Sequence, residues 1–138
     1  MKELELEAIT DNLEQIQMFV DEELEAVGCS PKAQIQIDIA VEEIFVNIAS
    51  YAYNPETGPA WIRVEVCEAP LSVSLTFIDK GVPYDPLAKA DPDTSLSADE
   101  RQIGGLGIYM VKESMDEVNY EYRDGQNILT LKKNIPEI

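Results

Sequence analysis

A glycine-rich turn, Gly104-Gly105-Leu106-Gly107, joins a polar segment to a short amphipathic helix that we expect to begin at about Leu106. Glycines let backbone N–H groups approach a ligand closely, and the start of a helix adds unpaired N–H donors and a partial positive charge. Both features favour an anion such as a phosphate. A Gly-Gly-x-Gly run is also typical of an ordinary turn, so the prediction of a phosphate site depends on the rest of the chain.

The hydrophobic pattern divides the 138 residues into short strands and amphipathic helices. Strands are expected over residues 3–9, 60–68, 71–79, 117–123 and 127–133. Helices are expected over residues 11–27, 31–53 and 106–115. Ser30 and Pro31 are a helix-start signal, and Asp124-Gly125 is a strong hairpin turn. The length and the lack of an internal repeat predict one domain over residues 1–138.

Residues 80–103 lie between a predicted strand and the glycine-rich turn and show no periodicity. Compact domains rarely keep such long loops unless the loops are functional or disordered, so this segment is a candidate lid. Disorder without a function is the alternative. The capping-like pair Ser97 and Glu100 predicts at least one helical turn inside the segment.

The composition excludes several classes of function. With 27 acidic against 10 basic residues the formal charge is −17, and no basic stripe is present for nucleic acid. The absence of histidine excludes Ser-His and Cys-His triads and histidine metal sites. No run of residues approaches the ~18 apolar residues of a membrane span, and the N-terminus lacks the apolar core of a signal peptide. We therefore expect a cytoplasmic protein that binds neither nucleic acid nor membrane.

Two polar stripes follow the helix predicted over residues 31–53. The first is expected to be an ordinary solvated face, formed by Gln34, Asp38 and Glu42. The second carries Glu43 and Asn47, one turn apart on one face.

The second stripe is expected to place the carboxylate of Glu43 and the amide of Asn47 among apolar neighbours. These neighbours are Ile35, Ile39 and Val46 on one side and Ala40 and Ile44 on the other. Buried polar groups need partners, and a ligand or metal would supply them. An internal hydrogen bond to a loop is the alternative.

Asp79 ends an apolar strand, and Gly81 follows two positions later. A carboxylate at a strand end can accept a hydrogen bond from an exocyclic amine such as that of adenine, and glycine lets a base pack against the backbone. Asp-x-Gly alone is also common in turns.

The order of these motifs is more specific than any one of them. Glu43-x-x-x-Asn47, Asp79-x-Gly81, a long loop and Gly105-x-Gly107 resemble the N, G1 and G2 boxes of the GHKL ATPase superfamily. Residues 40–47, 79–86 and 100–108 look still more like the anti-sigma factor serine/threonine kinases of bacterial partner-switching systems.

The resemblance implies an α/β (α+β) two-layer sandwich, the Bergerat fold, with a mixed, mostly antiparallel sheet and helices on one face. It implies ATP and Mg²⁺ as cofactors, with Asn47 holding the metal, Asp79 reading the adenine amine and Gly81 shaping the base pocket. The residues expected around the phosphates are Gly104, Gly105, Leu106 and Gly107.

The resemblance also implies which residues act in phosphoryl transfer. Glu43 would be the general base, and Arg101 of the lid could reach the charge that develops on the γ-phosphate, with a solvated cation as the alternative. Glu42 is the rival base, but it points away from Asn47 around the helix.

The implied function is that of an ATP-dependent serine/threonine kinase that phosphorylates an anti-sigma-factor antagonist and binds a sigma factor. Homodimers are common in that family, so a homodimer is a further expectation. The alternative is an ATP-gated binding module that sequesters a regulator without catalysing transfer. The two hypotheses differ in whether partner binding needs the carboxylate of Glu43.

Overall fold

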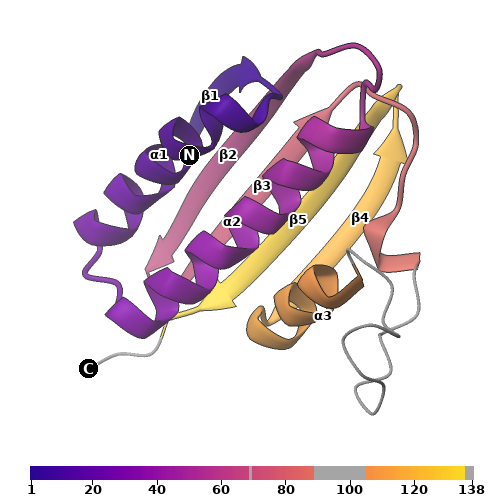
Figure 1. The fold of residues 1–138 in the computed structure, drawn as a ribbon. Helices are drawn as coiled ribbons and strands as arrows, with labels where there is room; N and C mark the ends of the chain where they lie inside the picture. The colour runs from indigo at the N-terminus through magenta and orange to yellow at the C-terminus, as the bar shows by residue number, and fades with distance from the viewer. Residues whose placement is uncertain (69, 89–104, 136–138) are drawn as a thin grey trace.

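A computed structural model describes residues 1–68, 70–88 and 105–135. The described segments form five strands, three α-helices and two short 3₁₀ helices (Figure 1). In chain order they are β1 (Lys2–Glu7), η1 (Thr10–Asn12), α1 (Leu13–Ala26), α2 (Pro31–Tyr51), β2 (Pro59–Glu68), β3 (Leu71–Asp79), η2 (Pro86–Ala88), α3 (Gly105–Ser114), β4 (Glu117–Arg123) and β5 (Gln126–Asn134). The predicted strands and helices are confirmed to within a few residues. The helical turn expected at Ser97 lies outside the described residues.

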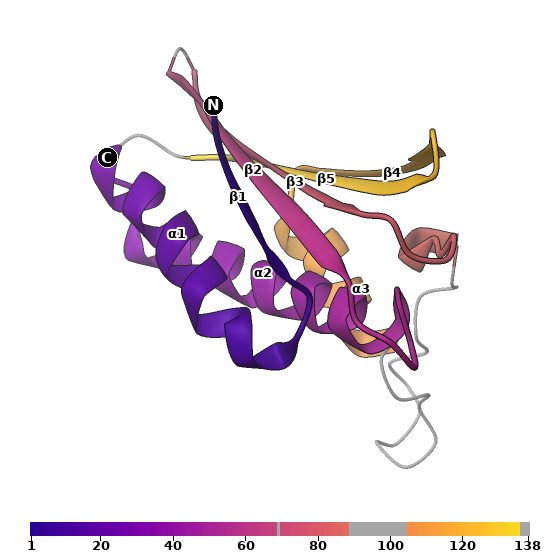
Figure 2. The same ribbon diagram turned by 90° about the horizontal axis from the view of Figure 1, so that it is seen from above.

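The strands form one sheet in the order β1-β2-β3-β5-β4. All four pairings are antiparallel, so the described sheet is more regular than the mixed sheet expected. The three α-helices lie on the same face of the sheet, which Figure 2 shows edge-on. This arrangement confirms the two-layer α+β sandwich.

Local signals explain the element boundaries. The Ser30 hydroxyl accepts a hydrogen bond from the Ala33 backbone N–H at 3.3 Å, and Pro31 occupies the first turn of α2. Asp124 and Gly125 both have positive φ in the β4–β5 turn, as a two-residue hairpin of this type requires.

The core lies between the helices and the central strands. β3 contributes a fully buried row, Val73, Leu75 and Phe77, and α2 contributes Ile37, Val41 and Phe45. Because α2 is the longest of the described helices and lies over the middle of the sheet, its polar residues near Tyr51 are held beside the end of β3 and the start of β5 (Figure 1). Among the described helices none is long and apolar enough to cross a membrane.

The prediction that Asp38 lies on a solvated face is wrong. Asp38 is half-buried between α1 and α2, and one carboxylate oxygen each of Asp38 and Asp21 is buried without a hydrogen-bond partner in the described structure. Burial, the hydrogen bond that a protonated Asp38 shares with Asp21, and the negative charges of Asp21 and Glu25 raise the pKa of Asp38 to about 7. The helical wheel could not show this because it does not indicate which neighbour covers a given face.

One flank of the second stripe differs from the prediction, while Ala40 and Ile44 on the other flank are buried as expected. Ile35 is 59% exposed and Ile39 is 46% exposed, so these residues do not bury Glu43. The outer face of α2 is not covered by another described helix (Figure 2). The partial burial of Glu43 comes from α3.

Candidate functional site

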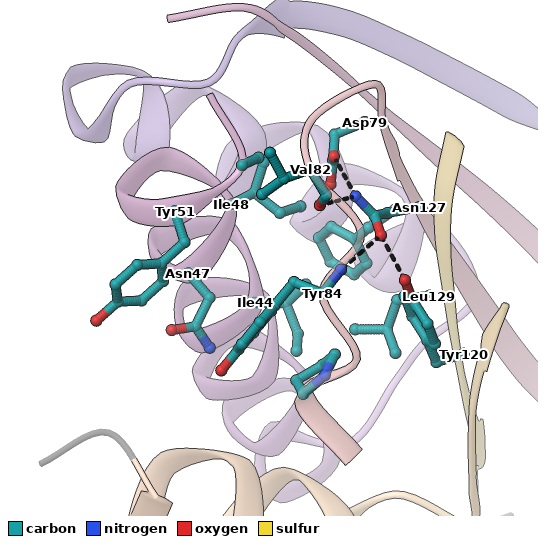
Figure 3. Close-up of a pocket in the computed structure, with 13 residues that line it drawn as sticks. Ile44, Asn47, Ile48, Tyr51, Asp79, Val82, Tyr84, Tyr120, Asn127 and Leu129 are labelled. Carbon is teal, nitrogen blue, oxygen red and sulfur yellow. Dashed lines mark hydrogen bonds between the residues drawn. The ribbon is translucent and has the colours of Figure 1, made fainter. Parts of the chain in front are cut away.

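A pocket opens where the C-terminal half of α2 meets the end of β3 and the start of β5 (Figure 3). Together with the solvent space at its open mouth, the pocket encloses ≈ 450 Å³. Its walls are mainly apolar and aromatic, with Asn47, Asp79 and Asn127 as polar groups. The lining residues are Ile44, Asn47, Ile48, Tyr51, Ala52, Phe77, Asp79, Val82, Tyr84, Pro86, Tyr120, Asn127 and Leu129.

Two ends of this region differ in construction and are named by their carboxylates. The Asp79 end comprises Asp79, Gly81 and Asn127. The Glu43 end comprises Glu43 and Asn47 on α2, together with Gly107 on α3. Sequence reasoning placed both carboxylates in one site. The structure brings Asn47 and Asp79 to the same pocket, whereas Glu43 is not among the residues that line it.

Asp79 is 5% exposed and is oriented by two donors. Its Oδ1 accepts hydrogen bonds from Asn127 Nδ2 and from the Gly81 backbone N–H, each at 2.9 Å. Burial raises the pKa of Asp79, and these two hydrogen bonds oppose the rise. Since both described hydrogen bonds go to Oδ1, Oδ2 is the acceptor left for a ligand's amine.

Asn127 is the functional residue that sequence reasoning missed. Its Nδ2 also donates to the Val82 carbonyl at 2.9 Å, and its Oδ1 accepts from the Tyr84 backbone N–H at 3.1 Å and from the Tyr120 hydroxyl at 2.5 Å (Figure 3). The Asn127 amide thus donates two hydrogen bonds and accepts two, which uses its hydrogen-bonding capacity within the protein. It therefore orients the neighbouring groups and has no free group for a ligand.

A signal for Asn127 was present in the sequence. Asn127 shares the alternation of Leu129 and Leu131, which are buried on the helix-covered face of β5. A polar residue that strand alternation places on the buried face needs hydrogen-bond partners there. The partner Asp79 could not be read from the sequence, because it depends on the β3–β5 register, which pairs Asp79 with Asn127.

At Gly81 the turn after β3 packs closely against the end of α2. A Cβ at Gly81 would lie 2.1 Å from the Ala52 carbonyl oxygen, so only glycine fits beside this backbone. The next residue, Val82, donates its N–H to the same Ala52 carbonyl at 2.9 Å and lines the pocket. The contact places Gly81 behind the pocket wall, where it allows the wall to approach α2.

Two tyrosines lie at the mouth of the pocket. Tyr51 at the end of α2 is 55% exposed, and its ring centroid is 6.0 Å from that of Tyr84 in a tilted arrangement. Figure 3 shows both rings beside Asn47. Aromatic faces at a pocket mouth suit a flat ring or a sugar.

At the Glu43 end, Asn47 Nδ2 donates to Glu43 Oε1 at 3.4 Å, a long hydrogen bond. Burial raises the pKa of Glu43, the Asn47 hydrogen bond opposes the rise, and the charge of Glu42 adds to it. Gly107 is so close that a Cβ there would lie 2.1 Å from Glu43 Cδ. Glu43 of the expected motif on α2 and Gly107 of α3 are therefore in direct contact.

The remaining predicted site residues lie at or beyond the edge of the described structure. Gly105 begins α3, one residue before the expected start, and Leu106 follows it in the helix. The side chain of Leu106, and all of Gly104 and Arg101, lie outside the described residues.

The donor set at the Glu43 end fits a magnesium ion. Mg²⁺ prefers oxygen ligands, keeps several waters and often takes only one or two protein ligands beside phosphates. Asn47 Oδ1 is an oxygen of this kind, and it is not the atom that contacts Glu43, because Nδ2 makes that hydrogen bond. The described residues hold no cluster of three or more acidic or sulfur ligands that would form a metal site without phosphates.

The fold and these three motifs define a class of nucleotide-binding domain. Residues 6–133 match the family described as the histidine kinase-like ATPase domain, and this chain belongs to that family.

Two named proteins are similar to this chain in sequence. The chain is 33% identical to the serine/threonine-protein kinase BtrW of Bordetella bronchiseptica over 102 residues, 74% of this chain and 71% of the relative. It is 27% identical to the serine-protein kinase RsbW of Listeria monocytogenes over 110 residues, 76% of this chain and 69% of the relative.

Solved structures agree on the fold. The RsbU and RsbW domains of a Mycobacterium tuberculosis protein match with a TM-score of 0.64 at 14% identity, over 98% of this chain and 33% of that longer chain. The SiaB–SiaC complex of Pseudomonas aeruginosa matches with a TM-score of 0.58 at 20% identity, over 96% of this chain and 89% of that chain.

Proposed function

We propose that this protein is an ATP-dependent serine/threonine kinase that phosphorylates an anti-sigma-factor antagonist, and that it binds a sigma factor when the antagonist is phosphorylated. One observation carries the proposal: Asp79, whose Oδ2 accepts no hydrogen bond from the described residues, and Asn47 line one pocket, and the carboxylate of Glu43 lies one helical turn from Asn47. The relatives named as serine kinases support the choice of reaction.

Each residue has a separate task in this proposal. Asp79 Oδ2 accepts the adenine amine, while Asn127 and Gly81 hold the other oxygen. Asn47 Oδ1 holds the magnesium ion, which when bound offsets phosphate charge. Glu43 accepts the proton of the attacking serine hydroxyl, and its raised pKa brings it nearer to the working pH of a base.

Radiolabelled γ-phosphate transfer to the antagonist encoded in the same operon tests the proposal. Wild type should label the antagonist, and Glu43→Gln should lower the rate on the order of 100-fold to 10,000-fold. Glu42→Gln is the matched control, because it removes the same charge from an exposed neighbour and should stay close to wild type.

If wild type does not label the antagonist, the proposed kinase activity is contradicted. In that case, binding of a partner that requires ATP and survives Glu43→Gln would support the binding module that catalyses no transfer. Sedimentation of the purified protein with and without ATP tests the expected homodimer separately.

A further inference from the structure

Gly107 contacts the whole carboxyl group of Glu43. A Cβ built at Gly107 would lie 2.1 Å from Glu43 Cδ, 2.2 Å from Oε1 and 2.4 Å from Oε2. These distances are far shorter than any atomic contact allows, so the carboxyl group occupies the space that a side chain at position 107 would need.

The obstacle at Gly107 differs in kind from the obstacle at Gly81. At Gly81 a Cβ would meet the backbone oxygen of Ala52, which cannot move without displacing the end of α2. At Gly107 the Cβ would meet the end of a flexible side chain. A methyl group at position 107 should therefore displace the Glu43 carboxylate and leave the helix in place.

Little else in the described structure holds this carboxylate. Its described hydrogen bond is the 3.4 Å contact from Asn47, which is too long to fix the orientation strongly. The first turn of α3 thus supplies the wall against which the carboxylate rests.

We propose that Gly107 is a positioning residue. Because it has no side chain, it leaves a slot that the carboxylate of Glu43 occupies, and this slot sets the orientation of the carboxylate. This inference rests on the proposed function, in which Glu43 accepts the proton. It differs from the expectation that Gly107 only surrounds the phosphates, because it assigns the effect of residue 107 to the transfer step.

Gly107→Ala tests the inference through separate measurements of ATP affinity and of kcat. The variant should lose on the order of 100-fold in kcat, as expected for loss of a general base. Calorimetric titration should show a much smaller change in ATP affinity. The factor by which the affinity falls should be at least about 10 times smaller than the factor by which kcat falls. Equal losses of affinity and kcat would overturn the inference and support a role in phosphate binding.

Gly105→Ala is the matched control, since it makes the same change two residues earlier in the same helix start. Its loss of affinity should equal or exceed its loss of kcat. If Gly105→Ala also lost much more kcat than ATP affinity, the effect would not be specific to the slot at Gly107, and the inference would be contradicted.

The double variant Glu43→Gln/Gly107→Ala tests whether both residues act on one step. If Gly107 acts through Glu43, the double variant should be no slower than Glu43→Gln alone, because the base is already absent. Multiplication of the two single losses would overturn the inference.

Crystal structures of wild type and Gly107→Ala give a readout that needs no kinase activity. The expected result is a Glu43 carboxylate moved away from residue 107, with the backbone of α3 unchanged. A shifted α3 with Glu43 in place would overturn the inference. If wild type transfers no phosphate, the proposed function fails, while this structural comparison still decides the slot.

Discussion

The Asp79 end and the Glu43 end of the site are held in different ways. At the Asp79 end, Asn127 makes four hydrogen bonds and Asp79 Oδ1 accepts two. At the Glu43 end, one 3.4 Å hydrogen bond joins Glu43 to Asn47. In the proposed function, the protein alone orients the Asp79 oxygen that would accept the adenine amine, whereas nucleotide and metal would complete the Glu43 end. Changes at the Asp79 end should therefore weaken the fold, and changes at the Glu43 end should weaken function alone.

The largest loss of stability is expected from Asn127→Leu, which keeps the shape and removes the amide. Asp79 Oδ1 loses one donor, and the Val82 carbonyl and Tyr120 hydroxyl lose partners. Each buried polar group left without its partner costs about 1–3 kcal/mol, so the free energy of unfolding should fall by about 3–4 kcal/mol. Urea unfolding without nucleotide measures this.

The matched control for that experiment is Asn119→Leu. Asn119 is an exposed asparagine on the neighbouring strand β4, so its replacement should change the free energy of unfolding by less than about 0.5 kcal/mol. Equal losses in the two variants would show that the network at Asn127 is not what stabilises the Asp79 end.

Gly81→Ala should produce the next largest loss. Its Cβ would meet the Ala52 carbonyl oxygen at 2.1 Å, so the turn after β3 must separate from α2. Overpacking of this kind costs about 1–3 kcal/mol. Gly107→Ala is the internal comparison, because its methyl group meets only a movable carboxylate. Thermal unfolding should show a lower Tm for Gly81→Ala and an unchanged or slightly higher Tm for Gly107→Ala.

If both glycine variants lost the same stability, the two ends would be equally rigid. The contrast drawn between them would then be wrong.

The two ends must be compared at a controlled pH, because Asp38 titrates near neutrality outside the pocket. The pKa of Asp38 is raised from 3.8 to about 7 in the folded state. The folded protein therefore binds more protons than the unfolded chain between these values, and this contribution to stability is lost as the pH rises from about 4 to about 7. Because Asp38 is only half-buried, solvent screens its charge in part, so we expect an effect of about 1–2 kcal/mol and not the full value of the shift.

Asp38→Asn isolates this effect. The variant should be more stable than wild type at pH 8 by about 1–2 kcal/mol, and the difference should vanish or reverse near pH 4. Glu42→Gln removes the same charge at an exposed site and controls for the net charge of −17. A pH-independent difference between Asp38→Asn and wild type would show that Asp38 does not titrate in this range.

The contrast between the ends also explains which parts of the site could be predicted from the sequence. Glu43, Asn47 and Asp79 were identifiable because each stands at a fixed offset within a local motif. Asn127 was not, because its role depends on a strand register that joins residues 48 positions apart. Local periodicity gives the face of an element and does not identify what lies opposite.

The same limit explains the errors on α2. The wheel placed Asp38 on an outer face and Ile35 among the residues that bury Glu43. In the structure α1 covers Asp38, Ile35 is exposed, and Gly107 of α3 contacts Glu43. The contacts between helices in a layer decide which polar groups are buried, and those contacts join distant parts of the chain.

The smallest change in stability is expected from Asn47→Ala, which is also the strictest test of the contrast. Alanine favours a helix interior by about 0.6 kcal/mol over asparagine, and the lost hydrogen bond is long, so the free energy of unfolding should change by less than about 0.5 kcal/mol. Calorimetric titration should nevertheless show that magnesium-dependent ATP binding is lost, because the metal loses its protein oxygen. Ser50→Ala, on the exposed side of the same helix, should change neither quantity. A loss of about 2 kcal/mol or more in Asn47→Ala would mean that the Glu43 end is built into the fold as firmly as the Asp79 end, since a ligand-binding residue outside the packed core has no reason to carry so much stability.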